Sequence, residues 1–337
     1  MNRLKRLTYF FSMLALLLIV FVGLLRLQVI QYIAAYTGFG FAHTTPVTLE
    51  KPDGFANADL ICQSQPIRVL TFNVRYGSDF IEAMRRPLGA SAPGDYQPWS
   101  VRYPEIKKLI DNYSPDVIGL QEMHTDKDIA HIVQLNRYTL STYHLKEFEY
   151  GDAALLFKTE RFDLLDSGQL WLGPNSTLPL SLGFKPFAMI RYINWVVLRE
   201  KNSRFSFLFL NTHFDNNPEN KEKSADLFYT HFADLIGAYP IILVGDFNTK
   251  AVTDRYQRLI GAKDNTPLLI NAYDLDVSID PAETAHPNEL IDHILVGGPC
   301  KTTANNWLVD KQTLPNGETL SDHFPVFAQV QFTGVKH

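Results

Sequence analysis

Basic residues are not in excess in this chain, which has 31 lysine and arginine residues against 36 aspartate and glutamate residues among its 337 residues. Proteins whose main partner is duplex nucleic acid usually carry a basic surplus, because neutralised phosphates supply much of their affinity. The sequence also contains no low-complexity tract and no repeat of fixed period. The composition therefore argues against a chain dedicated to duplex nucleic acid and against a repeat architecture.

Charged residues are absent from residues 7–25, and the basic residues Arg3, Lys5 and Arg6 precede this apolar stretch. A helix of about 20 residues spans the hydrocarbon core of a membrane, whereas the apolar part of a cleaved signal peptide has about 7–15 residues. The length of the stretch therefore favours a membrane anchor over a cleaved signal peptide. The positive-inside rule keeps the N-terminus in the cytoplasm and places the rest of the chain outside it.

Residues 1–26 are thus predicted to be the cytoplasmic N-terminus and the transmembrane anchor. Residues 27–65 mix aromatic residues, proline and glycine without a sustained period, and we interpret them as a juxtamembrane segment. No linker-like stretch divides residues 66–337, which are predicted to form one domain. Cysteine is scarce, and the two cysteines, Cys62 and Cys300, fit an exported domain that carries one disulfide or none.

Short apolar runs rich in β-branched residues indicate buried strands. These runs cover residues 67–74, 117–120, 153–158, 195–199, 205–210, 241–244, 291–296 and 324–332. A helix is predicted to open at Pro104, and another is predicted over residues 221–238, because apolar residues recur on one face of each. Strands that alternate with helices predict a layered α/β domain.

Acids, amides and imidazoles recur where the predicted strands end. Each of them alone could be a turn residue or a helix cap. Their recurrence at several strand ends favours an active site, because a rigid sheet commonly holds catalytic side chains on the loops that follow its strands. The residues that end or follow strands are Asn73, Glu122, Asn211, His213, Asp246 and Asn248. Asp292 lies inside an apolar strand, and Asp322 and His323 directly precede the last one.

Six stretches in this order carry a resemblance to a known family. They are TFNVRYG (71–77), DVIGLQEM (116–123), NTHFDN (211–216), LVGDFNTK (243–250), IDHILV (291–296) and SDHFPV (321–326). In them the chain resembles the endonuclease/exonuclease/phosphatase superfamily, which includes deoxyribonuclease I, exonuclease III, neutral sphingomyelinases and inositol polyphosphate 5-phosphatases. The resemblance covers residues 66–333 and implies a four-layered α/β sandwich. In that fold two mixed sheets pack face to face between outer helices, and the active site lies at one end of both sheets.

The resemblance implies a metal site and a divalent cofactor, Mg²⁺ or Mn²⁺. Glu122 matches the chief metal ligand of the family, Asn73 matches the amide that helps to order the metal shell, and Asp322 matches an acid near the metal. In exonuclease III-like members the residue two positions after the first asparagine is also an acid. Here that residue is Arg75, which puts a second metal site in doubt.

The resemblance also implies the catalytic residues. Asp246 matches the residue that orients or deprotonates the attacking water, and Asn248 matches the residue that holds the phosphate. Asp292 matches the carboxylate paired with the catalytic histidine, which is His323, and His213 matches the second histidine of the deoxyribonuclease I and sphingomyelinase branches. Weaker candidates for substrate contact are Arg75, Arg191, Asn211 and His286, each of which could instead be a plain surface or loop residue.

The chemistry of phosphoesters justifies these residue types. A hard cation held by carboxylate and amide oxygens neutralises charge on an anionic ester that otherwise repels nucleophiles. An imidazolium at His323, kept protonated by Asp292, can donate to a non-bridging oxygen as charge develops there. Neither a G-x-S-x-G elbow nor a Walker loop is present, so no covalent nucleophile is indicated.

The predicted function is therefore a divalent-metal-dependent hydrolase of phosphoester bonds, tethered to a membrane with its catalytic domain outside the cytoplasm. The alternatives are an extracytoplasmic endonuclease or exonuclease, and a catalytically inactive, membrane-tethered binding scaffold. Lipid, nucleotide and nucleic acid all remain open as substrates, and the oligomeric state is not predicted. The apolar segment 170–187 favours small or membrane-borne phosphoesters if it lies near the cleft, and has no such meaning if it is core.

The cysteines are expected at the end of the sandwich opposite the active site. Asn73 and Asp292 belong at the active-site end, so the chain before Asn73 carries Cys62 away from the site, and the strand after Asp292 carries Cys300 away from it. A disulfide could form there if the two Cα atoms lie within about 7 Å of each other.

Overall fold

The computed structural model describes residues 3–26, 61–75, 97–123, 126–141, 144–145, 148–149, 152–177, 181, 183–185, 188–262, 267–276 and 282–336. Helix α1 (Arg3–Arg26) is separate in sequence from the domain, and its side chains are described over residues 9–21. Within the described part of the chain, no helix is both long and apolar enough to cross a membrane. The anchor stays a prediction, and most of the predicted juxtamembrane segment lies outside the described residues.

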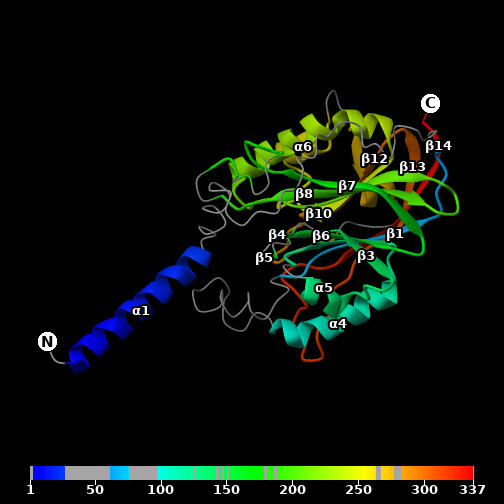
Figure 1. Cartoon of the computed structure of the whole chain (residues 1–337). Coiled ribbons are helices and arrows are strands. Elements are labelled where there is room, and N and C mark those ends of the chain that lie inside the picture. Colours follow the sequence, from blue (N-terminus) through cyan, green and yellow to red (C-terminus); the bar gives the residue numbers. More distant parts are fainter. Residues whose placement is uncertain are drawn as a thin grey trace.

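Two six-stranded sheets pack face to face (Figure 1). The strands of the first sheet, in spatial order, are β13 (Cys300–Val309), β14 (Val326–Val335), β1 (Ile67–Asn73), β2 (Val117–Gln121), β6 (Ala153–Lys158) and β3 (Tyr138–Ser141). The strands of the second sheet are β11 (Leu269–Asn271), β12 (Asp292–Gly297), β10 (Ile241–Asp246), β9 (Ser206–His213), β8 (Tyr192–Glu200) and β7 (Phe162–Trp171). Strands β4 (His144–Leu145) and β5 (Phe148–Glu149) form a separate small pair.

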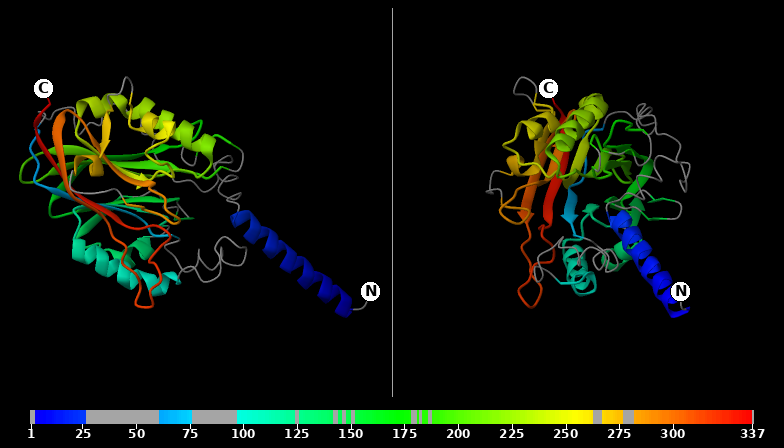
Figure 2. Two further views of the ribbon diagram at one scale, coloured as in Figure 1. Left: turned by 180° about the vertical axis from the view of Figure 1, so that it is seen from behind. Right: turned by 90° about the vertical axis from the view of Figure 1, so that its left-hand side faces the viewer.

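Both sheets are mixed. Strand β1 pairs with β2 in parallel and with β14 antiparallel, while β10 pairs with β9 in parallel and with β12 antiparallel. Helices α4 (Trp99–Tyr113) and α5 (Asp126–Ile132) cover the outer face of the first sheet, and α6 (Pro218–Ala238) and α7 (Asp254–Leu259) cover the outer face of the second (Figures 1 and 2). The short helix α8 (Ala272–Leu275) packs instead on the apolar cluster between the sheets. The predicted α/β sandwich, with helices outside two packed mixed sheets, is confirmed.

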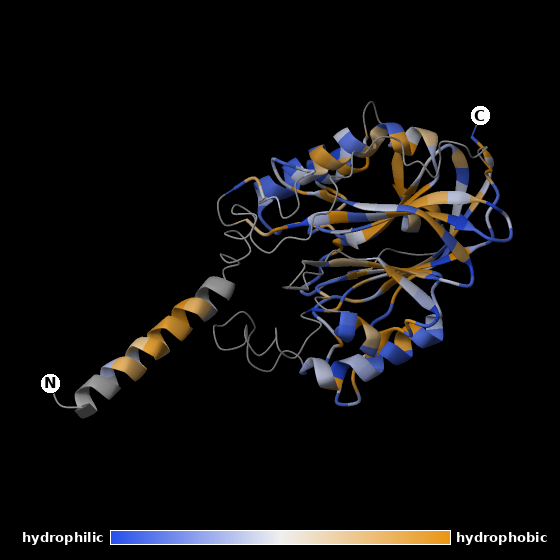
Figure 3. Cartoon of the chain, viewed as in Figure 1, coloured by the Kyte–Doolittle hydropathy of each residue, from blue (hydrophilic) through white to orange (hydrophobic). Residues whose placement is uncertain are grey.

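Three apolar clusters hold the layers together, and Figure 3 shows apolar positions gathered where sheets and helices face each other. The first cluster lies between the sheets and includes Val69, Phe209 and Val244. The second packs α6 and α7 on β8, β9 and β10, and the third packs α4 and α5 on β1 and β2. Central strands such as β2 and β10 are buried along their whole length, which explains why their sequences are continuous apolar runs rather than alternating ones.

Strand register brings the predicted polar residues to one end of the sandwich. Asn73 lies beside Gln121 where β1 and β2 end, so the next residue of the chain, Glu122, lies at the same edge. In the other sheet Asp246 pairs with His213 on one side and with Asp292 on the other. These carboxylates, amides and imidazoles therefore meet because the strands that carry them end together.

The cysteines lie at the opposite end, as expected. Cys62 and Cys300 form a disulfide, with their Cα atoms 5.3 Å apart. Around it the chain before β1 pairs with β14, because Ser64 exchanges hydrogen bonds with Phe332 and the Cys62 carbonyl accepts from the amide of Gly334. The disulfide and these bonds fasten the start of the domain to the sheet.

One expectation is wrong, and of the two alternatives left open for segment 170–187 the described side chains favour the core. Helix α4 begins at Trp99 rather than at Pro104, because the buried side chains of Trp99 and Arg102 anchor an additional first turn. The apolar segment 170–187 contributes to the core where it is described, since Leu170 and Leu172 belong to the cluster beneath α6. Those side chains give no support for a lipid-binding cleft.

Candidate active site

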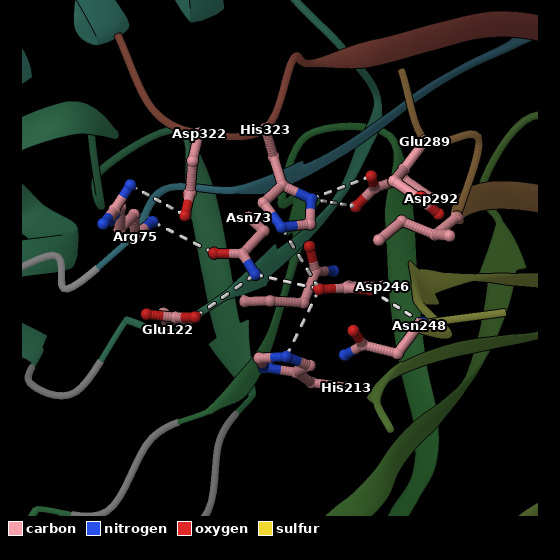
Figure 4. Close-up of polar contacts among 12 residues, drawn as sticks. Asn73, Arg75, Glu122, His213, Asp246, Asn248, Glu289, Asp292, Asp322 and His323 are labelled. Atoms are coloured by element: carbon pink, nitrogen blue, oxygen red, sulfur yellow. Dashed lines mark hydrogen bonds and ion pairs between the residues drawn. The ribbon is translucent and has the colours of Figure 1, made fainter. Parts of the chain in front are cut away.

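The carboxylate of Asp246 lies at the centre of the polar cluster (Figure 4). Its Oδ2 atom accepts a hydrogen bond from Asn73 Nδ2 at 3.0 Å and lies 3.3 Å from His213 Nε2 and 3.6 Å from His323 Nε2. Its Oδ1 atom accepts from the backbone amide of Asn248 at 2.8 Å. Burial opposes ionisation, but the two histidines and these hydrogen bonds hold the pKa of Asp246 well below its usual range.

The first histidine of the site is paired with a buried carboxylate. His323 Nδ1 donates to Asp292, at 2.9 Å and 3.1 Å from the two oxygens. Thr284 Oγ1 in turn accepts the backbone amide of Asp292 at 3.0 Å, which fixes that carboxylate. Burial opposes the charged imidazolium, but the carboxylates of Asp292 and Asp246 outweigh it and raise the pKa of His323 well above 6.5. His323 is therefore an imidazolium whose Nε2 side faces Asp246.

The second histidine, His213, is also paired with a carboxylate through Nδ1, and its Nε2 lies near Asp246. His213 Nδ1 lies 3.0 Å from an oxygen of Asp152, which also forms an ion pair with Arg191. Burial and the nearby Arg191 disfavour protonation, but Asp152 and Asp246 outweigh both and raise the pKa of His213 to about 9. Two Asp–His pairs, one on each side, thus direct imidazolium groups at the same carboxylate oxygen of Asp246.

Three site residues have left-handed backbone conformations that are uncommon outside glycine. The φ angles are 60° at Glu122, 48° at Asn248 and 49° at Arg75. Such conformations cost free energy and persist only where surrounding contacts enforce them. At Asn248 those contacts are visible, since its Nδ2 donates to the Phe214 carbonyl at 2.9 Å and its own carbonyl accepts from Lys221 Nζ at 2.8 Å.

The predicted metal ligands lie on the other side of Asn73. Glu122 Oε1 is 3.4 Å from Asn73 Nδ2, and Asp322 pairs through Oδ2 with Arg75 Nη1 at 2.9 Å (Figure 4). Glu122 and Asp322 also act on each other electrostatically, because the negative charge of Glu122 contributes to a raised pKa at Asp322, whose main cause is burial. Glu122 and Asp322 are partly exposed carboxylates of the kind that a hard divalent cation prefers. Asn73 directs its Nδ2 at Glu122, and its Oδ1 accepts from the amide of Arg75 at 3.0 Å.

A second set of donor atoms, from Asp246, Asp292 and His323, lies within 4.8 Å of one another. Within this set, His323 Nδ1 and Asp292 already form a hydrogen bond with each other. An imidazolium there is a proton donor rather than a metal ligand, because a histidine must be neutral to coordinate a cation. We therefore favour Glu122 and Asp322, with Asn73, as the residues that fit a cation.

The four weaker substrate candidates lie in different places. Arg75 and Arg191 lie in the cluster, where they pair with Asp322 and Asp152. His286 is exposed, its amide donates to the Asp322 carbonyl at 2.9 Å, and its ring packs edge-on against Phe324.

Asn211 was a wrong candidate. Its side chain is fully buried, and its Nδ2 donates to the carbonyls of Leu120 and Ala154 in the other sheet at 3.0 Å and 2.8 Å. Its Oδ1 accepts from Gln121 Nε2 at 2.6 Å. The residue ties the two sheets together and has no surface to offer a substrate.

Several supporting residues were not predicted from the sequence. Asp152, at the start of β6, positions His213, and Lys221, in the first turn of α6, holds the carbonyl of Asn248. Arg102 is fully buried and donates to the carbonyls of Val74 and Arg75, which follow β1. The sequence signal for Asp152 was its place directly before an apolar strand, but an acid at that position is equally typical of a turn.

The chain matches the model of the Endonuclease/Exonuclease/phosphatase family over residues 70–323. No curated protein matches it. Among solved structures, an endonuclease/exonuclease/phosphatase from Bacteroides vulgatus is 22% identical with a TM-score of 0.63, covering 80% of this chain and 100% of that chain. A mannosyl-6-phosphatase from Bacteroides thetaiotaomicron VPI-5482 is 23% identical with a TM-score of 0.62, covering 79% and 100%. The human Nocturnin catalytic domain with bound sulfate is 22% identical with a TM-score of 0.59, covering 84% and 100%.

Proposed function

Because this chain belongs to the endonuclease/exonuclease/phosphatase family, we propose that it hydrolyses phosphoester bonds with the help of a divalent metal ion. The observation that carries the proposal is the meeting of two Asp–His pairs at Asp246 Oδ2, which lies 3.3 Å from His213 Nε2 and 3.6 Å from His323 Nε2. A buried carboxylate with a strongly lowered pKa, flanked by two imidazolium groups, suits the handling of water and an anionic ester.

Asp246, His323 and His213 have different roles in the proposed reaction. Asp246 orients the attacking water, since an ionised carboxylate held by Asn73 and Asn248 has a fixed direction. His323, kept protonated by Asp292, donates to a non-bridging phosphoryl oxygen as negative charge increases there. His213 supplies a second positive charge from the opposite side.

The residues that would hold the metal ion are Glu122, Asp322 and Asn73. The carboxylates of Glu122 and Asp322 match the oxygen donors that Mg²⁺ and Mn²⁺ prefer, and both are partly exposed. Asn73 would contribute by holding Glu122 through its Nδ2. When bound, such an ion neutralises charge on the phosphoryl oxygens and orients the ester.

The metal requirement is tested by chelation. The full-length protein, in detergent, should release product from a phosphoester in Mg²⁺ or Mn²⁺, and EDTA should abolish that release until the metal is restored. Glu122→Gln removes one carboxylate of the donor set, so it should require a higher metal concentration for half-maximal rate. Glu105→Gln, which changes an acid paired with Lys108 on α4, is the matched control and should keep the wild-type metal dependence. Undiminished turnover in EDTA would contradict metal assistance.

A nuclease is the second candidate function within the same chemistry. The net charge of −5 and the shortage of basic stretches disfavour duplex DNA, and the neighbour named as a mannosyl-6-phosphatase makes a sugar phosphate a sensible member of a substrate panel. The inactive-scaffold alternative is less well supported, because a binding scaffold has no physical need for two buried Asp–His pairs directed at one carboxylate.

We place the catalytic domain outside the cytoplasm on two supports. The Cys62–Cys300 disulfide suits an oxidising compartment. Large apolar side chains of α1 are exposed, among them Leu18 and Ile19, and basic residues lie in the first turn of that helix. Alkaline phosphatase, which requires export, should be active when fused after residue 60 and inactive when fused after residue 6. Equal activity of the two fusions, or an inactive fusion at residue 60, would contradict this placement.

A further inference from the structure

A cavity of about 580 Å³ opens beside the catalytic residues, on the side of the Arg75–Asp322 ion pair. Its volume is in the range of pockets that take small molecules. Arg75 and Asp322 connect the cavity to the catalytic residues. Its other described lining residues are His286, Pro287, Gly317, Glu318 and Thr319.

The walls of this cavity are held by defined contacts. Thr319 pairs with Thr313 across a short hairpin, and Glu318 Oε2 accepts from Gln97 and from Asn316, which fixes that side chain. On the opposite wall, the amide of His286 donates to the Asp322 carbonyl at 2.9 Å. The cavity is therefore built from two loops that the fold fastens to the catalytic strand ends.

The chemistry of the described lining residues disfavours three kinds of ligand. An acyl chain needs aliphatic walls, and Pro287 is the only aliphatic ring or chain among the described lining residues. A nucleobase needs an aromatic stacking surface, and His286, which packs edge-on against Phe324, is the one aromatic ring among the described lining residues. A second phosphate needs uncompensated positive charge, whereas Arg75 is paired with Asp322 and Glu318 adds a carboxylate.

The same lining suits neutral hydroxyl groups. The Thr319 hydroxyl can donate and accept, and Glu318 Oε1 is an acceptor without a partner among the described residues. We infer that this cavity binds the leaving group of the phosphoester, and that the leaving group is a neutral polyol such as a sugar. The inference rests on the proposed function, because the phosphoryl group has to lie at Asp246 for the ester oxygen to point toward the cavity.

The test compares two phosphomonoesters in the full-length protein with Mg²⁺. A hexose 6-phosphate carries the hydroxyl groups, and phenyl phosphate carries none. The wild type should give a higher kcat/KM on the hexose 6-phosphate. Thr319→Val should increase KM for the hexose 6-phosphate about ten-fold more than KM for phenyl phosphate, as expected for one lost hydrogen bond to a sugar hydroxyl. Glu318→Gln removes the charge of an acceptor but keeps a polar group, so it should change KM in the same direction by a smaller factor.

Two further variants separate recognition from folding. Thr319→Ser keeps the hydroxyl and should restore the preference. Thr313→Val removes a hydroxyl from the same hairpin outside the described lining, and should leave both KM values unchanged. An equal decrease of kcat/KM on the hexose 6-phosphate and on phenyl phosphate in Thr319→Val and Glu318→Gln would show a structural effect and overturn the inference.

The outcomes distinguish the two proposals. Hydrolysis of phenyl phosphate with equal or better kcat/KM, or a preference for a dinucleotide or for phosphatidic acid vesicles, would overturn the polyol inference and leave the phosphoesterase function standing. No product from any of these esters in Mg²⁺ or Mn²⁺ would overturn the proposed function and the inference with it.

Discussion

Single residues of the site divide into those that the sequence could reveal and those that it could not. Asp246, Asp292 and His323 were predictable because each is a polar residue in or beside an apolar strand, in a recognisable motif. Asp152 was not, because its partner His213 lies on the other sheet, and a sequence carries no distance between two packed sheets. Asn211 was misjudged for the same reason, since its partners also lie across the interface.

The Asp152–His213 pair makes a prediction about titration. NMR of the histidine rings should give His213 a pKa of about 9, because Asp152 and Asp246 outweigh burial and Arg191. Asp152→Asn should lower that pKa by removing the carboxylate 3.0 Å from Nδ1. His231, whose pKa is lowered by burial, is the internal control and should not change.

The same pair also predicts a pH dependence of stability. A pKa raised above 6.5 stabilises the folded state fully below pH 6.5, and this contribution is lost as the pH rises through about 9. Asp152→Asn should therefore reduce the free energy of unfolding more at pH 6 than at pH 10, as measured by denaturant titration. An equal reduction at both pH values would show that the contact does not hold a charged imidazole.

At the scale of elements, the strands that the sequence failed to predict lie at sheet edges. Strand β7 is the last strand of one sheet and β13 is the first strand of the other. Both are buried on one face only and carry Asp, Asn, Gln, Lys or Thr on the other, so neither is a continuous apolar run. The central strands were predicted because both of their faces are covered, which selects apolar and β-branched residues throughout.

Helix α4 shows how tertiary contacts move the end of an element. Pro104 is favoured at a helix start, yet it lies inside α4. The first turn forms because Arg102, which is fully buried, donates to the carbonyls of Gln97, Val74 and Leu320. The helix thereby holds the chain that follows β1 and the chain that precedes Asp322.

Arg102→Lys tests this role of α4. An ammonium group cannot replace a guanidinium that donates to several carbonyls, so buried acceptors lose their partners at about 1–3 kcal/mol each. The free energy of unfolding should decrease by roughly 3 kcal/mol, measured by denaturant titration. Lys107→Met, on the same helix in a partly exposed pair with Asp111, is the control and should change stability by less than about 0.5 kcal/mol. Equal effects of the two substitutions would contradict the account of α4.

At the scale of the whole molecule, the layered α/β class was predictable from alternating strands and helices, but the division of strands between two sheets was not. Strands β2 and β10 have the same buried, apolar character, and nothing in that pattern assigns one to each sheet. The family resemblance supplied the sandwich, and the structure confirms it. Because both sheets end at the same side, Asn73 from one sheet and Asp246 from the other come within 3.0 Å.

The meeting of the two sheets at Asp246 is the central claim, and the turnover of Asp246→Asn tests it most directly. The substitution keeps the size of the side chain but removes the charge that His213 and His323 face, and with it the carboxylate that orients the attacking water. Product release from the best phosphoester in Mg²⁺ should decrease by about 10³-fold or more, equivalent to about 4 kcal/mol of transition-state stabilisation, while circular dichroism and the melting temperature show a folded protein. Turnover within ten-fold of the wild type in a folded Asp246→Asn protein would contradict the account.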